Sequence, residues 1–213
     1  MADVQAFIRA NTRLLSPPLV PEIKLYLAEE SIPIWQKTEE ELGEMNVPPP
    51  FWAFAWAGGQ ALARYLLDNP EVCQGKRVLD LGSGSGLTAI AAMMSGASLV
   101  LASDIDAYSL AACQANAEAN GTAFDVTTND LLAAPPGLFD VVLVGDLFYE
   151  KTLADRVGAF IDEAKAKGAV IMIGDPQRSY FPRSRFTLLA EFEVPVTREL
   201  EDSLIKKTAV WRA

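Results

Sequence analysis

RVLDLGSGSG, at residues 77–86, decides the fold of this 213-residue chain. Its first half, Arg77–Leu81, is a short apolar run typical of a buried strand, and three glycines follow it at alternate positions. A helix is expected over 87–94. A glycine-rich turn between a strand and a helix lets the backbone approach a ligand closely. The segment therefore predicts both an α/β unit and a binding site.

The same order of elements recurs along the chain. Further strands are expected over 99–102, 124–128, 139–144 and 169–173, with helices over 107–120 and 153–167. The apolar runs are continuous rather than alternating, which is typical of a parallel sheet covered on both faces. Residues 186–196 and 204–211 are expected to close the sheet as a hairpin-like pair. The predicted class is α/β, a Rossmann-like sheet with an antiparallel edge.

The first 70 residues differ in character from the rest. They contain an expected helix over 4–14, an aromatic cluster over 51–56, and a helix over 60–67 that follows Gly58-Gly59. We expect residues 1–70, including the helix over 60–67 that leads into the core, to form an extension packed over the predicted binding site. Residues 71–213 are expected to form the core of the same single domain.

Composition excludes several function classes. The chain has 18 Lys and Arg against 28 Asp and Glu, a net charge of −10, which opposes non-specific binding to nucleic acid and favours a basic partner. It has no histidine, so Ser-His-Asp catalysis and histidine-ligated metals are excluded. Two separated cysteines, no secretory signal and no membrane-length apolar run predict a cytoplasmic protein with no metal site.

The glycine-rich turn predicts a ligand without phosphates. A dinucleotide site needs G-x-G-x-x-G, whereas the third glycine here follows the second by two positions. Asp80 at the strand end would also repel a pyrophosphate. It suits a ligand with a sulfonium and an ammonium, as in S-adenosyl-L-methionine. The turn residues expected to contact this cofactor are Asp80, Gly82, Ser83, Gly84 and Gly86.

Carboxylates follow the next two strands. Asp104 ends the second strand, where a carboxylate can accept both ribose hydroxyls of a nucleoside, with Ile105 beside it. Asp130 ends the third strand and is expected to accept from the adenine amino group, with Leu131 beside the ring. Asp106 and Asp125 are interpreted as solvated loop charges.

The segment GDLFY at residues 145–149 follows the fourth strand and predicts the site of the group that accepts a methyl from this cofactor. Asp146 and Tyr149 are three residues apart on one turn, so both can face the transferable methyl. A lysine amine needs an acceptor that orients it and a desolvated aromatic surround that eases its deprotonation. The alternatives are that Asp146 caps the following helix, and that Trp52 and Trp56 only pack in the core.

These segments resemble a known group. Asp80–Gly86, Asp104–Asp106 and the D-L-F-Y turn are similar to the seven-β-strand (class I) protein-lysine methyltransferases, which carry D-x-x-Y after the fourth strand. The block FWAFAWAGGQALARYLLDNP at 51–70, joined to D-L-F-Y and Gly174-Asp175-Pro176, resembles the electron transfer flavoprotein β-subunit lysine methyltransferases. The likeness runs from about Pro21 to Trp211.

The resemblance implies a seven-stranded sheet, S-adenosyl-L-methionine as cofactor, and lysines of the flavoprotein β subunit as acceptors, with no nucleic acid, membrane or metal. It also implies that Trp56 and Gly58 line the cofactor pocket, beside Gly145, and that Asp146 and Tyr149 meet the lysine. Methyltransferases of a large-subunit ribosomal protein carry an extra N-terminal domain and an N-P-P-type loop, which this sequence lacks. The alternatives are a small-molecule amine methyltransferase, a non-catalytic cofactor-binding scaffold, and other acceptors such as a carboxylate, an arginine or a ribosomal protein.

Overall fold

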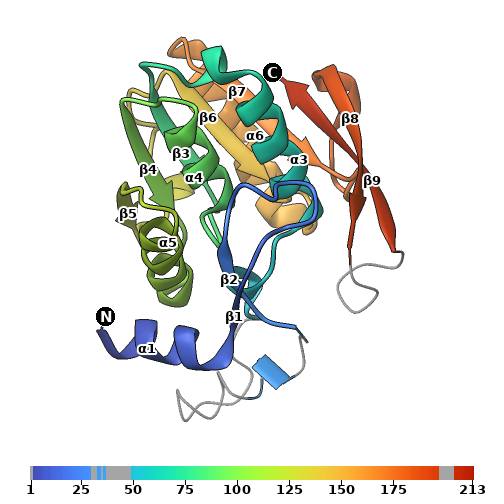
Figure 1. Ribbon diagram of the computed structural model, residues 1–213. Coiled ribbons are helices and arrows are strands. Elements are labelled where there is room, and N and C mark those ends of the chain that lie inside the picture. Colours follow the sequence, from blue (N-terminus) through green and yellow to red (C-terminus); the bar gives the residue numbers. More distant parts are fainter. Residues whose placement is uncertain (1, 30–32, 35, 37–48, 197–203) are drawn as a thin grey trace.

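A seven-stranded, mostly parallel sheet forms the centre of the molecule, as predicted (Figure 1). The computed structural model describes residues 2–29, 33, 34, 36, 49–196 and 204–213. Neighbouring strands follow the order β5 (Asp125–Thr127), β4 (Leu99–Ser103), β3 (Arg77–Leu81), β6 (Val141–Gly145), β7 (Val170–Asp175), β9 (Ile205–Arg212) and β8 (Thr187–Pro195). The first five are parallel, and β9 pairs antiparallel with both β7 and β8. The predicted closing pair is confirmed.

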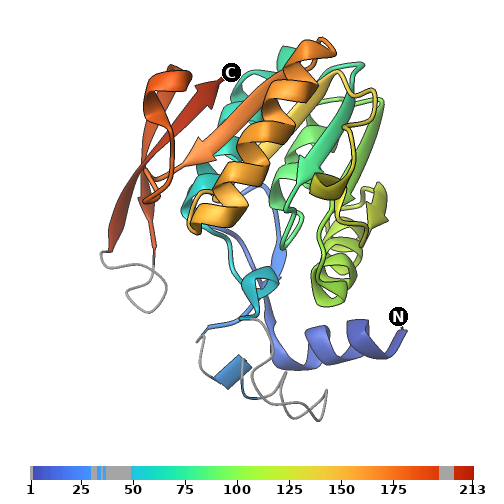
Figure 2. The same cartoon turned by 180° about the vertical axis from the view of Figure 1, so that it is seen from behind.

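Alternate strand residues bury the two faces of this sheet against different helices. In β6, Val141 and Leu143 belong to the core under α3 (Ala57–Asp68) and α4 (Leu87–Met94), whereas Val142 and Val144 pack with α6 (Lys151–Ala166). Side chains of a strand alternate between faces, so both faces need apolar residues and the runs become continuous. Figure 1 shows α4 with α5 (Ala107–Ala119), and the reverse view in Figure 2 shows α6 across the opposite face.

The N-terminal helix is shorter than predicted. Helix α1 is Ala2–Asn11, and Arg13–Leu15 form strand β1, which pairs antiparallel with β2 (Leu25–Leu27). The expectation of helix to residue 14 is wrong because Asn11 and Thr12 turn their side chains back onto the carbonyls of Phe7 and Ile8. Such side-chain bonds to the backbone compete with helix continuation.

Helix α3 begins three residues earlier than predicted and contains both glycines of the Gly58-Gly59 pair. It contacts α4, β7 and β9, so it is part of the main core. Short helical turns lie at Phe51–Ala53, Pro70–Val72, Leu131–Ala133 and Arg183–Arg185. The division of the chain at residue 70 stays a prediction.

The strand order places a binding site at one edge of the sheet. From β3 the chain moves to β4 on one side and later to β6 on the other. Ligands of open α/β sheets bind at such a reversal, outside the carboxyl ends of the strands. No described helix is long and apolar enough to span a membrane.

Candidate active site

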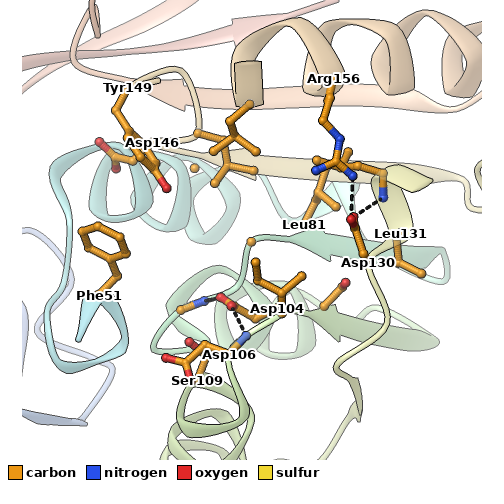
Figure 3. A pocket seen from close by; sticks show the side chains of 18 of the residues that line it. Phe51, Leu81, Asp104, Asp106, Ser109, Asp130, Leu131, Asp146, Tyr149 and Arg156 are labelled. Atoms are coloured by element: carbon orange, nitrogen blue, oxygen red, sulfur yellow. Dashed lines mark hydrogen bonds and ion pairs between the residues drawn. The ribbon is translucent and has the colours of Figure 1, made fainter. Parts of the chain in front are cut away.

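A cavity of about 650 Å³ lies at this edge, a volume within the range of small-molecule sites. Figure 3 shows Phe51, Asp146 and Tyr149 at one end and Asp130, Leu131 and Arg156 at the other, with Asp104, Asp106 and Ser109 on the β4 side. The predicted residues that line it are Trp56, Gly82, Gly84, Asp104, Ile105, Asp130, Leu131, Gly145, Asp146 and Tyr149.

The glycine-rich turn folds tightly onto the end of β4. Gly82 and Ser83 donate their backbone N–H groups to the Ser103 carbonyl, and Gly84 donates to the Asp104 carboxylate. Gly82 has a φ of +68°, and a Cβ there would lie 2.6 Å from a Leu147 methyl group. Glycine therefore serves both the left-handed conformation and the close approach of the turn.

Four predicted cofactor contacts do not line the cavity: Gly58, Asp80, Ser83 and Gly86. Asp80 is 1% exposed, and its carboxylate accepts hydrogen bonds from Thr88 Oγ1 at 2.6 Å and the Ala89 backbone N–H at 3.0 Å. Burial raises its pKa to about 7, and these two bonds oppose that rise. Asp80 therefore anchors the start of α4 and does not line the cavity, and its contact with the cofactor stays a prediction.

The other residues that miss the cavity support its walls. Gly86 is the residue before α4, and a Cβ there would lie 3.0 Å from the Cys113 Sγ. Ser83 is buried with its hydroxyl 3.5 Å from the same sulfur. Gly58 packs against Gly174 of β7 and against Asp146.

Asp104 is fixed by backbone N–H groups. Its Oδ2 accepts from Gly84 at 2.9 Å, and its Oδ1 accepts from Asp106 at 3.0 Å. Burial raises the pKa of Asp104, and the bonds from Asp106, Gly84 and the Ser109 hydroxyl act in the opposite direction. The carboxylate reaches the cavity in a fixed orientation. Asp106 was interpreted as a solvated charge, but it also lines the cavity and caps α5 by accepting from the Tyr108 N–H.

Asp130 lies at the end of the cavity opposite Asp146, called the far end below, and two groups hold its carboxylate. Its Oδ1 accepts from the Leu132 N–H at 3.1 Å, and its Oδ2 pairs with Arg156 Nη2 at 2.6 Å. Leu131 and Leu153 add apolar surface beside it. Sequence reasoning missed Arg156, because its position in the amphipathic helix α6 does not indicate which cavity the side chain reaches.

Asp146 occupies an unusual backbone conformation at the near end. It follows β6 with a φ of +56°, its N–H donates to the Gly174 carbonyl, and its Oδ2 accepts from the Gly59 N–H at 3.0 Å. It is only 8% exposed. A non-glycine residue in the left-handed region is sparsely populated and needs surrounding contacts to hold it. The alternative role as helix cap is wrong, because Glu150 caps α6.

Aromatic side chains line the same end of the cavity as Asp146. The Phe51 ring lies 5.7 Å from the Tyr149 ring and 5.8 Å from the Trp56 ring, centroid to centroid. Phe51 and Tyr149 are 40% and 46% exposed, so they form an open rim, whereas Trp52 is fully buried in the core. Partial burial raises the pKa of the Tyr149 hydroxyl, and the charges of Asp104 and Glu150 add to the effect.

Arg178 is the main functional residue that sequence reasoning missed. Its Nη2 and Nε lie 2.7 Å and 3.1 Å from Asp146 Oδ1, and its guanidinium carbon lies 5.7 Å from the centroid of the Trp56 ring. The signal was present in the segment GDPQR at 174–178, which leaves β7 beside β6. The family resemblance includes only Gly174-Asp175-Pro176 of this segment and so gives no indication of Arg178.

The charges of the cavity indicate its ligand. Four aspartates and two arginines line it, and each arginine pairs with one of these aspartates. The lining is thus acidic, which suits a ligand with cationic groups and hydroxyls better than a pyrophosphate. Within the described part of the chain, no cluster of three or more histidine, cysteine or acidic residues could hold a metal ion.

Comparison with known proteins identifies the family of this chain. Residues 60–174 match the family model described as ribosomal protein L11 methyltransferase (PrmA). The electron transfer flavoprotein β-subunit lysine methyltransferase of Danio rerio is 40% identical over 99% of this chain and 83% of its own length. This chain belongs to the electron transfer flavoprotein β-subunit lysine methyltransferases. Residues 60–174 also place it in the wider family that the PrmA model describes.

The ribosomal protein L11 methyltransferases match less of this chain. A ribosomal protein L11 methyltransferase of Exiguobacterium is 32% identical over 67% of this chain and 44% of its own length. Among solved structures, magnesium protoporphyrin IX methyltransferase of Synechocystis, determined with bound SAM, has a TM-score of 0.54. It is 17% identical and covers 85% of this chain and 91% of its own, which supports the class I methyltransferase fold.

Proposed function

We propose that this protein transfers the methyl group of S-adenosyl-L-methionine to lysine amines of the electron transfer flavoprotein β subunit. One observation carries the proposal: a nearly buried carboxylate, Asp146, lies at one end of an acidic cavity beside the half-exposed rings of Phe51 and Tyr149. The names of relatives that align with almost the whole chain support the same acceptor. The compartment, expected from sequence to be the cytoplasm, stays a prediction.

The chemical groups that line the cavity match those of the methyl donor. Gly82 and Gly84 expose backbone, Asp104 offers carboxylate lone pairs to ribose hydroxyls, and Leu131 offers apolar surface to the base. Asp130 accepts from the Leu132 N–H and pairs with Arg156, so its charge is largely offset in this wall of the cavity. When bound, the donor supplies a methyl carbon that forms a C–N bond with the neutral amine as its C–S bond breaks, after the amine has lost one proton to solvent.

The near end suits a side chain that enters from a protein surface. Tyr149 and Phe51 flank the entrance and can cover the methylene groups of a lysine, excluding water from its amine. Asp146 is rigid because backbone and side-chain groups hold it, so it can orient the amine toward the donor. A small-molecule enzyme would instead need a closed acceptor pocket.

Ribosomal protein L11 is a second candidate acceptor, because the family model matched by residues 60–174 bears that description. The purified protein is incubated with labelled methyl donor and each of three acceptors: the flavoprotein β subunit, L11 and free lysine. We expect label on lysines of the β subunit, located by mass spectrometry. Label on L11 alone, or on free lysine alone, would reject the proposed acceptor.

Asp146→Asn tests the acceptor site in the same assay. The amide keeps the size of the side chain but removes its charge. We expect the rate of transfer to fall by about 100-fold or more, with the affinity for S-adenosylhomocysteine nearly unchanged. Asp125→Asn, at the exposed first residue of β5, makes the same chemical change away from the cavity and should retain full activity. A fully active Asp146→Asn protein would remove Asp146 from the acceptor site.

A further inference from the structure

The loop after β7 holds Arg178 in a defined position. The Arg178 backbone N–H donates to Asp175 Oδ1 at 2.7 Å, and Gln177 between them adopts a φ of +65°. Asp175 is fully buried beneath the loop. The side chain of Arg178 then passes along the Trp56 ring to Asp146. An arginine held at both its backbone and its guanidinium loses less conformational freedom when it acts than a mobile one.

Asp146 alone would create a chemical problem. Only an uncharged amine has the lone pair that attacks a methyl carbon, and a free lysine is neutral in about one part in a thousand at neutral pH. A carboxylate beside an ammonium favours the charged form, so it raises the pKa of the amine and makes the nucleophile scarcer. The residue best placed to orient the amine therefore opposes its deprotonation, unless its charge is offset.

Arg178 supplies that offset. Its Nη2 and Nε lie within 3.1 Å of the same Asp146 oxygen, so the guanidinium offsets the charge of the carboxylate. A cation close to the cavity also disfavours a second cation there. Arginine suits this role because it stays protonated throughout the working pH range.

We propose that Arg178 is a positioning residue that keeps the bound acceptor lysine in its neutral, nucleophilic form by pairing with Asp146 at the end of the cavity. This inference rests on the proposed function, because it concerns the amine that the function assigns to this site. It adds a residue from the loop after β7 to the D-L-F-Y turn. It also explains why a carboxylate can serve an amine whose proton must leave.

Other titratable groups face the same end from neighbouring elements. Tyr149 and Glu150 follow β6, Asp104 follows β4, and Asp175 ends β7. Burial raises the pKa of Asp175 to about 7, with a further contribution from the charge of Asp146 and opposition from Arg178. Asp175 thus titrates below the range in which a lysine amine does, and Tyr149 has a pKa above its usual value. Asp175 therefore titrates near the acid end of the pH range from 6.5 to 10, and Tyr149 beyond its alkaline end.

The test is the pH dependence of the single-turnover rate, measured from pH 6.5 to 10 on the full-length protein with saturating donor and flavoprotein β subunit. Arg178→Met and Arg178→Gln remove the cation, and Arg178→Lys retains it. Arg185→Met is the matched control. Arg185 also pairs with an aspartate, Asp162, and lies 5.7 Å from an aromatic ring, but on the surface outside the cavity. Melting curves and S-adenosylhomocysteine binding report the integrity of each variant.

We expect removal of the cation to shift the acidic side of the pH–rate profile to higher pH by about 1 to 2 units. The rate at pH 7.5 should fall by about 10- to 100-fold and recover as the pH approaches 10. Arg178→Lys should stay near the wild-type midpoint, and Arg185→Met should match the wild-type curve.

Three results would overturn the inference. A loss of rate in Arg178→Met and Arg178→Gln that is equal at every pH would indicate a purely structural role for Arg178. An unchanged rate would show that Arg178 does not act on the amine. A wild-type protein that methylates no lysine would remove the proposed function and the inference together, whereas the first two results leave the proposed function intact.

Discussion

A single methyl group at Gly58 should disable the site while leaving most of the fold in place. Gly58 lies in the first turn of α3 without a positive φ, so alanine meets no backbone strain there. Its Cβ would instead lie 2.3 Å from the Gly174 carbonyl oxygen and 2.4 Å from Asp146 Oδ2. An ordinary contact of a Cβ with another heavy atom is at least 3.4 Å, so α3 must retreat from β7 by about 1 Å.

The cost of that retreat has two parts. Overpacking a well-packed interior costs about 1–3 kcal/mol, and weakening the bond from the Gly59 N–H to the Asp146 carboxylate costs about 1–3 kcal/mol more. A total of roughly 2–6 kcal/mol is comparable to the stability of an ordinary domain and corresponds to a fall in melting temperature of roughly 4 to 24 °C. The protein should therefore fold, with Asp146 displaced.

Gly59→Ala provides the matched control one residue away. A Cβ at Gly59 would meet only a Leu87 methyl group at 3.9 Å, an ordinary contact, and alanine favours a helix over glycine by up to about 1 kcal/mol. Calorimetric melting and the methyl-transfer assay are run on both variants. Gly58→Ala should melt lower and lose transfer, whereas Gly59→Ala should melt at or above the wild-type temperature and stay active. Equal behaviour of the two variants would refute the steric argument.

Two further predictions concern the carboxylates. Asp104→Ala should weaken S-adenosylhomocysteine binding by about 10- to 100-fold in calorimetry, because it removes a charged acceptor fixed by Gly84; unchanged affinity would remove Asp104 from the donor site. For Asp175, the folded-state pKa is raised from 3.8 to about 7, so its contribution to stability is present below about pH 4 and is lost as the pH rises to 7. The free energy of unfolding of Asp175→Asn, relative to wild type, should therefore increase by up to a few kcal/mol between pH 4.5 and 8 in urea titrations; a constant difference would contradict the raised pKa.

The sheet could be predicted from sequence because its signals are local. Each buried strand is an apolar run, and each is followed by a turn or helix with its own composition, so the order of elements can be derived without any contact between them. Segment 2–15 was harder. The side chains of Asn11 and Thr12 end α1, and Arg13–Leu15 become a strand only because Leu25–Leu27 lie beside them. Pairing between separate segments overrides helix propensity there.

The direction of the Asp80 side chain is a feature of the site that was not predicted from sequence. In β3, Leu79 and Leu81 pack toward α6, so Val78 and Asp80 point to the opposite face, where α4 begins. The alternation of a strand could have given this result. The prediction considered only the place of Asp80 at the end of a strand and its charge. Arg178 and Arg156 are different, because each reaches an aspartate 32 or 26 positions earlier in the chain, a distance over which local patterns give no information.

The two aspartate–arginine pairs make the charge of the cavity uneven along its length. Asp130 with Arg156 and Asp146 with Arg178 leave both ends nearly neutral, whereas Asp104 in the middle is held by N–H and hydroxyl donors that carry no full charge. The negative potential is thus concentrated where a donor with hydroxyls and a sulfonium would lie. The acceptor end can then admit a neutral amine without trapping an ammonium, because a carboxylate paired with arginine attracts cations only weakly. One cavity can in this way bind a cationic donor tightly and still keep its acceptor uncharged.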